Sequence, residues 1–397
     1  MKLTRYEGDP IIEPRGDDRE AIATFTCATM APSDDHTGRT KTMLKIALMS
    51  RWNAACGTSL LGELIGRELL RRGYKLFILA PSNDDKPIAP SDEEEVIRCY
   101  SIYEFGWREV RKELDPKPFL NLDYNIFMAQ GFRFITCAEQ FRQIFPEIKK
   151  KARTIYIVHE RNLGSSPFAE FDWDALICFD QRYKKLVSQA FPEERCKIIP
   201  YPYHPVVRGD RREAREKLGL PQNKRIILSF GWRMEDYIPL LPIIEEVNQE
   251  FPLRYVIVAD PRAALEAEEM KGKDFIELRY EVPPTERLYT YLHASDCLLL
   301  HKKDVGEGEV VVSSVVHMCL GSLTPIVTAA TKYVEMLGEE VIKYSDLSEL
   351  KDKLRGVFED RDLVNRTIKE AERRVREDSP GKITDEYVKL FNSLLAE

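Results

Sequence analysis

Short apolar runs alternate with amphipathic stretches from about residue 45 onward. The first apolar run, residues 45–50, precedes a loop of small residues, and leucine and isoleucine then recur at three- and four-residue spacing over residues 60–70. This spacing predicts an amphipathic helix. A second apolar run at residues 75–80 completes a strand–helix–strand unit, whose right-handed crossover makes the two strands parallel.

The same alternation continues through most of the chain. Further strands are predicted at residues 124–128, 154–158, 175–179 and 196–200. Residues 200–205 are rich in proline and predict a semi-rigid linker, because proline disrupts a helix interior. Beyond this linker the pattern restarts, with strands predicted at residues 225–230, 254–259, 297–300 and 325–328 and helices at residues 239–251, 347–360 and 361–377.

We therefore predict an α/β fold in which two doubly wound, Rossmann-like domains face each other across a cleft. Residues 1–40 are polar and rich in turn formers, and they are expected to form an irregular N-terminal extension. The first domain is expected at residues 41–203 and the second at residues 204–380. Because such sheets bind ligands at the carboxyl ends of their strands, we expect the site in the cleft.

Residues 310–331 carry no Asp, Glu, Lys or Arg and are long enough to cross a bilayer. The stretch also contains several serines and threonines together with His317, Gly321 and Pro325. This mixture favours a buried helix, a turn and a buried strand. We therefore expect no transmembrane segment.

Composition narrows the class of protein. The chain has 397 residues and a formal net charge of −7, so it has no overall attraction for phosphate backbones, which argues against nucleic-acid binding as its main role but leaves room for a local basic patch that holds one small anion. Its eight cysteines form no C-x-x-C pair, and several lie in apolar runs. The first ten residues have no apolar core. These features predict a cytoplasmic protein with reduced thiols, no zinc site and no signal peptide.

Loops that follow predicted strands carry residues suited to ligand binding. Gly57 and Thr58 begin the first helix, where free backbone amides attract an anion, although a tight capped turn explains them equally well. His159 follows a strand and either forms a hydrogen bond with a sugar hydroxyl or is a structural histidine. Gly231 and Arg233 follow the first strand of the second domain. The arginine fork suits a diphosphate, and the alternative is an arginine on a solvated turn.

A loop between a buried strand and a buried helix of the second domain carries a further set of candidate binding residues. Lys302 and Lys303 come first, Glu309 follows in a glycine-rich acidic stretch, and Ser313 and Ser314 lie near the start of the helix. Hydroxyls and free amides there would cradle a phosphate, while the carboxylate would hold sugar or ribose hydroxyls. A charged run by itself is usually a solvated turn, and its junction with the start of a buried helix is what favours a binding role here.

Taken together, these features resemble the retaining GT-B glycosyltransferases, the group that includes sucrose-phosphate synthases and bacterial mannosyltransferases. The resemblance covers roughly residues 44–395 and keeps the order and spacing of the family's segments. The ordered series of segments is more specific than any one of them. The matching segments are residues 46–73, 158–160, 197–200, 217–221, 229–231, 292–297, 320–321 and 325–327.

The resemblance implies a retaining transfer of a sugar from a nucleoside diphosphate sugar, a UDP- or GDP-sugar, to a carbohydrate or small-molecule acceptor. It puts Gly57 beside the donor phosphates, His159 near the donor sugar and Arg233 on the diphosphate. The base would lie near Glu281 and Val282, and the acceptor would bind the first domain. No metal or other cofactor is implied. The family's last helix commonly returns to the first domain, a role expected here for residues 381–397.

The sequence departs from the family pattern beside the expected diphosphate. Family members usually have a lysine shortly after the position of Arg233, and none stands there in this chain. Two lysines lie instead after a later strand of the same domain. We expect Lys302 or Lys303 to take the place of the missing lysine.

The usual pair of glutamates is also incomplete. Glu309 matches the first of them, whereas the second position falls near the apolar Val316, so Ser313 and Ser314 are expected to take over donor contacts. Because of these two departures, a non-catalytic protein that binds a sugar or a nucleotide is also compatible with the sequence. A nucleotide-sugar epimerase or a phosphorylase of the same fold is also compatible with the sequence. The sequence leaves open the sugar, the base, the acceptor and whether the chain forms a homo-oligomer.

Overall fold

The computed structural model describes residues 44–83, 92–103, 111–231, 233–263 and 270–397. The chain divides into two units, Met1–Thr42 and Met43–Glu397, and all described residues belong to the second unit. The predicted N-terminal extension, with Cys27, lies outside the described residues.

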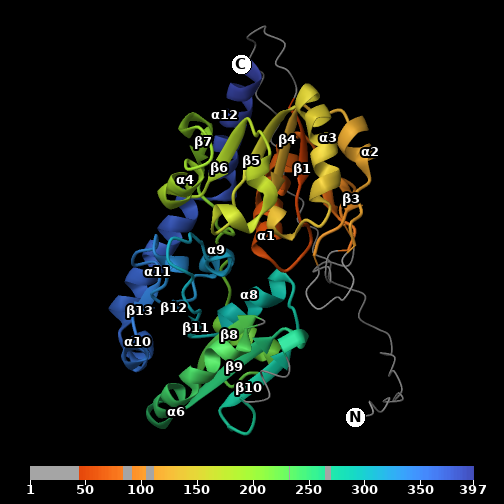
Figure 1. The fold of residues 1–397 in the computed structure, drawn as a ribbon. Coiled ribbons are helices and arrows are strands. Elements are labelled where there is room, and N and C mark those ends of the chain that lie inside the picture. The colour runs from red at the N-terminus through yellow and green to blue at the C-terminus, as the bar shows by residue number, and fades with distance from the viewer. Residues whose placement is uncertain (1–43, 84–91, 104–110, 232, 264–269) are drawn as a thin grey trace, which may run out of the picture. The chain divides into compact units, whose positions relative to one another are not determined.

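Residues 45–198 build a seven-stranded sheet in which all neighbouring strands are parallel (Figure 1). The strand order is β3-β2-β1-β4-β5-β6-β7, so the direction of winding reverses between β1 and β4. The strands are β1 (Lys45–Met49), β2 (Lys75–Pro81), β3 (Val96–Tyr100), β4 (Ile126–Gln130), β5 (Arg153–Ile157), β6 (Ala175–Cys178) and β7 (Cys196–Ile198). The accompanying helices are α1 (Gly57–Arg71), α2 (Pro116–Asn121), α3 (Ala138–Lys151) and α4 (Gln181–Val187).

Residues 225–344 build a second, six-stranded parallel sheet in the order β10-β9-β8-β11-β12-β13. Its winding reverses between β8 and β11. The strands are β8 (Arg225–Gly231), β9 (Leu253–Ala259), β10 (Ile276–Tyr280), β11 (Cys297–Leu300), β12 (Ile326–Ala329) and β13 (Ile342–Tyr344). The helices are α5 (Arg211–Leu218), α6 (Leu241–Glu250), α8 (Thr285–Ala294), α9 (Ser314–Cys319), α10 (Leu347–Glu359), α11 (Arg361–Glu377) and α12 (Pro380–Ala396).

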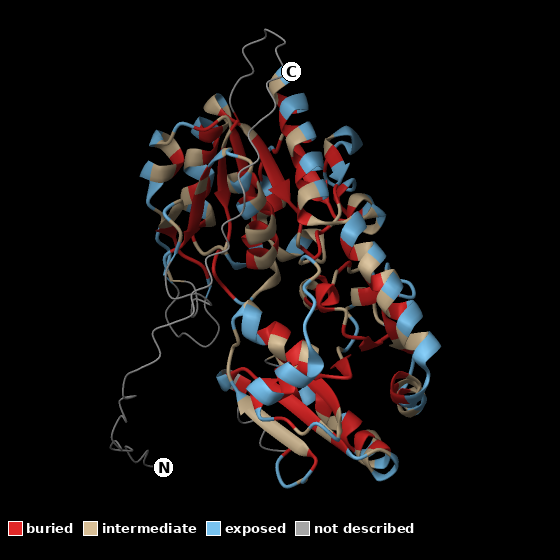
Figure 2. Cartoon of the chain, turned by 180° about the vertical axis from the view of Figure 1, so that it is seen from behind, coloured by how far each residue is buried: buried red, intermediate tan, exposed pale blue. Residues whose placement is uncertain are grey.

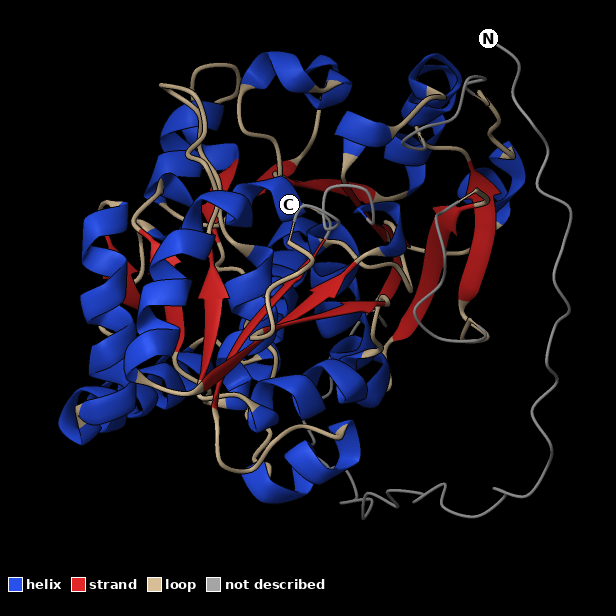
Figure 3. Ribbon diagram, turned by 90° about the horizontal axis from the view of Figure 1, so that it is seen from below, coloured by secondary structure: helices blue, strands red, loops and turns tan. Residues whose placement is uncertain are grey.

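Helices cover both faces of each sheet, and the strands are therefore apolar on both sides (Figure 3). In β8 the alternation of side chains sends Ile227 into one core and Ile226 and Leu228 into the other. Figure 2 shows most strands as buried, with exposed residues following the outer faces of the helices. The two predicted doubly wound sheets are thus present.

The C-terminal helix α12 follows the second sheet in the chain but packs against the first sheet (Figure 1). Tyr387 and Phe391 are fully buried in the core of the first sheet. Arg72, at the end of α1, donates from Nη1 to Asp385 Oδ1 at 2.7 Å and from Nη2 to the Gly381 carbonyl at 2.6 Å. An apolar face and a charged end therefore fix α12 against α1.

One predicted helix starts where it was expected, and another becomes α-helical later. The buried helix expected near Ser313 and Ser314 starts at Ser314 and is six residues long, and before it the Val310 amide donates to the Arg161 carbonyl at 3.0 Å. The helix expected at residues 239–251 begins as a 3₁₀ turn, η5 (Met234–Leu240), and becomes α-helical only at Leu241. Within the described ranges, every helix falls short of the length and apolarity that crossing a membrane requires.

Replacing Phe391 by alanine should lower the free energy of unfolding by about 3–5 kcal/mol, because truncating a fully buried phenylalanine leaves a cavity. Denaturant unfolding followed by circular dichroism measures this loss. Lys389→Ala, on the exposed face of the same helix, is the control and should cost less than about 0.5 kcal/mol. Equal stability of Phe391→Ala and the wild type would contradict this account of α12.

Candidate functional site

The carboxyl ends of the parallel strands bring loops of both sheets together. The winding reverses between β1 and β4 in the first sheet and between β8 and β11 in the second, and open α/β sheets bind ligands at such points. The loops or strand ends at these four places contain Gly57, Gln130, Arg233 and Lys302. Three of these four residues are ones that the sequence predicted for the donor site.

Tyr333 contacts one cation from each sheet. It lies in the 3₁₀ turn η8 (Lys332–Val334), shortly after β12. The ammonium of Lys302, which follows β11, lies 4.9 Å from the centre of the tyrosine ring. The guanidinium of Arg161, which follows β5, lies 5.7 Å from that centre, and its Nη2 donates to the tyrosine hydroxyl at 2.6 Å. Cation–π attraction and this hydrogen bond hold two positive groups at one ring.

The surroundings of Lys302 disfavour its charged form. Burial lowers the pKa of Lys302 to about 8, and repulsion from Arg233 and Arg161 acts in the same direction. The buried carboxylate of Asp236 partly opposes these effects. Lys302 thus lies near two other cations and one carboxylate, and that carboxylate also pairs with Lys303. An anion bound among these cations would favour the charged form of Lys302.

The end of β8 positions Arg233. Gly231 closes the strand with φ of +133°, a conformation that favours glycine, and Arg233 then precedes η5 with an exposed side chain. Lys303 is also exposed, and its ammonium lies 3.7 Å from Asp236 Oδ1. Of the two predicted lysines, Lys302 is therefore the one held inside the cluster, and Lys303 lies at its edge.

The start of α1 touches the start of α9. A Cβ added to Gly57 would lie 2.8 Å from the Cβ of Ser314, so a larger residue would push the two helices apart. The Tyr201 hydroxyl donates to the Gly57 carbonyl at 2.6 Å and fixes this junction from the linker side. The Ser59 amide donates to the capping Cys56 Sγ at 3.4 Å, and the preceding amides of Gly57 and Thr58, which have no acceptor within the helix, are suited to an anion.

Thr58 and Ser313 support the scaffold beside this junction. Thr58 is buried, and its carbonyl accepts from Gln130 Nε2 at 3.1 Å. Ser313 is buried as well, and its hydroxyl accepts from the Val316 amide at 3.4 Å, which caps α9. Ser314 is half-buried and leaves its hydroxyl at the contact with α1.

His159 is neutral and oriented by Gln130. The Gln130 amide nitrogen donates to Ser50 Oγ at 2.7 Å and to the Thr58 carbonyl, so its Oε1 acts as an acceptor for His159 Nε2 at 2.7 Å. This leaves His159 Nδ1 as a hydrogen-bond acceptor. Burial lowers the pKa of His159 to about 3, which keeps the ring uncharged near neutral pH. The neighbouring Glu160 is buried and accepts from Tyr156 Oη at 2.6 Å.

Glu309 links a loop of the second sheet to a loop of the first. Its Oε1 accepts from Asn162 Nδ2 at 2.8 Å, and its Oε2 accepts from the Gly306 amide at 3.2 Å. Arg182 of α4 makes a parallel connection, donating to the Lys332 carbonyl at 3.0 Å and to Glu335 Oε2 at 2.6 Å. Both oxygens of Glu309, which was predicted to hold hydroxyls of the donor, are therefore engaged by the protein itself.

Glu281 and Val282 lie apart from this cluster, after the edge strand β10. Strand order puts β10 two strands from β8, a separation of about 10 Å. Glu281 Oε2 accepts from Arg287 Nε at 2.6 Å, and Glu281 also accepts from the Tyr291 hydroxyl. Arg233 and Lys302, predicted to bind the phosphates, thus follow other strands of the second sheet than Glu281 and Val282, predicted to bind the base.

Three residues of the site were missed by the sequence analysis. Arg161 and Gln130 stand at the carboxyl ends of predicted strands, so the rule that pointed to His159 also applied to them. Tyr333 lies in a short turn that no periodic pattern marks, and its pairing with Arg161 spans 172 residues. In the part of the chain that the structure describes, no three His, Cys, Asp or Glu side chains gather as metal ligands.

No model of a known protein family matches the chain. Solved structures do: a sucrose-phosphate synthase from Thermosynechococcus elongatus is 15% identical with a TM-score of 0.63, over 89% of this chain and 99% of that one. A glycosyltransferase from Rickettsia africae is 12% identical with a TM-score of 0.64, again over 89% and 99%. Anabaena HepE, in complex with UDP and glucose, is 13% identical with a TM-score of 0.60, over 88% and 100%. These likenesses confirm the predicted GT-B fold.

Binding of a diphosphate ester at this cluster should weaken as the pH rises past about 8, because Lys302 then loses the proton that gives it its charge. A charged hydrogen bond contributes about 1.5–3 kcal/mol, so the loss between about pH 7 and about pH 9.5 should be roughly ten-fold or more. In Lys302→Arg the charge persists and the affinity should stay nearly constant. Calorimetric titrations across this range measure both proteins, and identical pH profiles would contradict this account of Lys302.

Proposed function

We propose that the chain is a retaining glycosyltransferase that moves a hexose from a nucleoside diphosphate sugar to a hydroxyl of a carbohydrate or small-molecule acceptor. The observation that carries the proposal is the cluster of Arg161, Arg233 and Lys302, in which cations from both sheets come together at the carboxyl ends of the strands. A bound diphosphate would interact favourably with all three. HepE, a protein of the same fold, has been solved with UDP and glucose.

In the proposed reaction, the bond between the anomeric carbon and the diphosphate breaks while the acceptor oxygen bonds to the same face of that carbon. The acceptor's proton passes to the departing diphosphate, so no further reactant is needed. Negative charge grows on the diphosphate as the bond breaks, and fixed cations stabilise this charge more in the transition state than in the ground state. Arg233 and Lys302 would supply most of this stabilisation, with the amides at Gly57 beside them.

His159 would bind the donor sugar. Its uncharged ring offers Nδ1 as an acceptor for a sugar hydroxyl, while Gln130 fixes its orientation. The base of a UDP- or GDP-sugar would lie toward Glu281 and Val282. The acceptor would bind on the first sheet's side. The enzyme would be cytoplasmic. The seven described cysteines form no disulfide, in keeping with that compartment.

A non-catalytic nucleotide-sugar-binding protein is the second candidate. Glu309 has both oxygens engaged by Asn162 and Gly306, and the buried Val316 stands near the family's second glutamate. Both candidates require nucleotide binding, and only the transferase requires turnover. Product analysis with UDP- and GDP-sugars and a broad set of acceptors separates them: a new glycoside with the donor's anomeric configuration supports the transferase, and binding without any product supports the second candidate.

The double variant Arg233→Ala with Lys302→Ala should weaken the binding of UDP or GDP by roughly 100-fold or more, because two charged hydrogen bonds of about 1.5–3 kcal/mol each are lost. Sugar transfer should fall at least as far. Arg212→Ala with Lys217→Ala is the control, since it removes the same two charges from exposed positions of α5. Unchanged binding and transfer in the Arg233→Ala, Lys302→Ala protein would refute the proposed donor site.

A further inference from the structure

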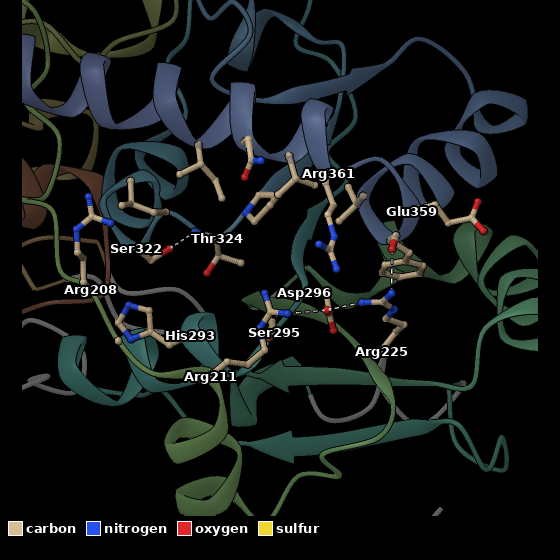
Figure 4. Close-up of a pocket in the computed structure, with 18 residues that line it drawn as sticks. Arg208, Arg211, Arg225, His293, Ser295, Asp296, Ser322, Thr324, Glu359 and Arg361 are labelled. Atoms are coloured by element: carbon tan, nitrogen blue, oxygen red, sulfur yellow. Dashed lines mark hydrogen bonds and ion pairs between the residues drawn. The ribbon is translucent and has the colours of Figure 1, made fainter.

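A cavity of about 860 Å³ lies at the other ends of the second sheet's strands (Figure 4). Arg225, Asp296 and Pro325 line it, and each stands at or directly before the first residue of β8, β11 or β12. Since β8 has seven residues, its two ends are about 20 Å apart. The cavity is therefore separate from the candidate donor site at the carboxyl ends.

More arginine side chains than acidic side chains surround this cavity. Asp296 is 5% exposed, and its oxygens lie 2.9 Å from Arg215 Nη2, 3.1 Å from Arg211 Nη1 and 3.3 Å from Arg225 Nη1. The same carboxylate accepts from the Ile226 amide at 2.7 Å, which fixes its position. One negative charge faces three positive ones, so a surplus of positive charge remains at the cavity wall.

A fourth guanidinium adds to this surplus. Arg361 is the first residue of α11, and Figure 4 shows its side chain directed toward Asp296 and Arg225. Within the ranges that the structure describes, no ion pair joins Arg361 to a carboxylate. Glu359, the other acidic residue of the lining, points away from the cavity in Figure 4. The excess charge is thus turned toward the interior of the cavity.

We propose that this cavity binds a phosphate monoester of a small molecule. Guanidinium groups such as those of Arg211, Arg225 and Arg361 match phosphate oxygens in pairs, and a doubly charged phosphate would cancel the surplus. The volume lies within the range of small-ligand sites. Phe358 and Val364 supply an apolar wall against which the carbon skeleton of such a ligand would pack.

Calorimetric titration of the full chain with inorganic phosphate, glucose 6-phosphate and glucose tests the proposal. Arg211→Gln with Arg361→Gln should weaken the binding of both phosphate compounds by about ten-fold or more, because it removes two charged donors. Both side chains are exposed, so the variant should keep the fold, which thermal unfolding verifies. Arg212→Gln with Arg366→Gln, exposed positions of the same two helices outside the lining, is the matched control and should bind like the wild type.

Saturable binding of the two phosphate compounds, with none of glucose, would support the site, and the loss in the Arg211→Gln, Arg361→Gln protein would locate it. No binding of phosphate, equal binding of glucose, or unchanged affinity in that variant would overturn the proposal. Displacement of phosphate by UDP would also overturn it, because the phosphate would then occupy the donor site. A failure of both UDP and GDP to bind contradicts the proposed transferase alone, so the two proposals fail on different measurements.

Discussion

The attraction of two cations for one tyrosine is the interaction on which the candidate site depends. Arg161 and Lys302 belong to different sheets, yet both contact Tyr333, so the loops of the two sheets are fixed at the place where positive charge accumulates. Burial lowers the pKa of Lys302, and repulsion from the neighbouring positive charges of Arg233 and Arg161 lowers it further. A ring can hold both cations without neutralising either, which leaves their charge available to an anion.

Parallel strands explain why this cluster forms where it does. Every strand of a parallel sheet ends at the same edge, so residues far apart in sequence meet there once the winding order is set. The same strands have a second edge, where β8 and β11 begin beside Arg225 and Asp296. One sheet therefore offers two separate positive regions, one at each end of its strands. The first is shared with the other sheet, and the second is built by the second sheet and its own helices.

The sequence predicted the central strands well and missed three of the four edge strands. Runs such as residues 45–50 and 297–300 are apolar because both of their faces are covered, and this makes them easy to recognise. The strands β3, β10 and β13 were not predicted. β10 is only half-buried and carries charged residues among its apolar ones, while β13 has three residues. Edge strands need fewer apolar side chains, so their pattern is weaker.

For the candidate site, position after a strand pointed to Arg233, Lys302 and His159 as candidates, since that rule uses only local sequence. It did not reveal that Glu309 bonds Asn162, or that Tyr333 joins Arg161 to Lys302, because those contacts depend on how two sheets meet. The most direct test of the central claim is a crystal structure of the full chain with UDP. We predict that the diphosphate lies among Arg161, Arg233 and Lys302. A diphosphate bound elsewhere, for example in the cavity beside Arg211, would contradict the account.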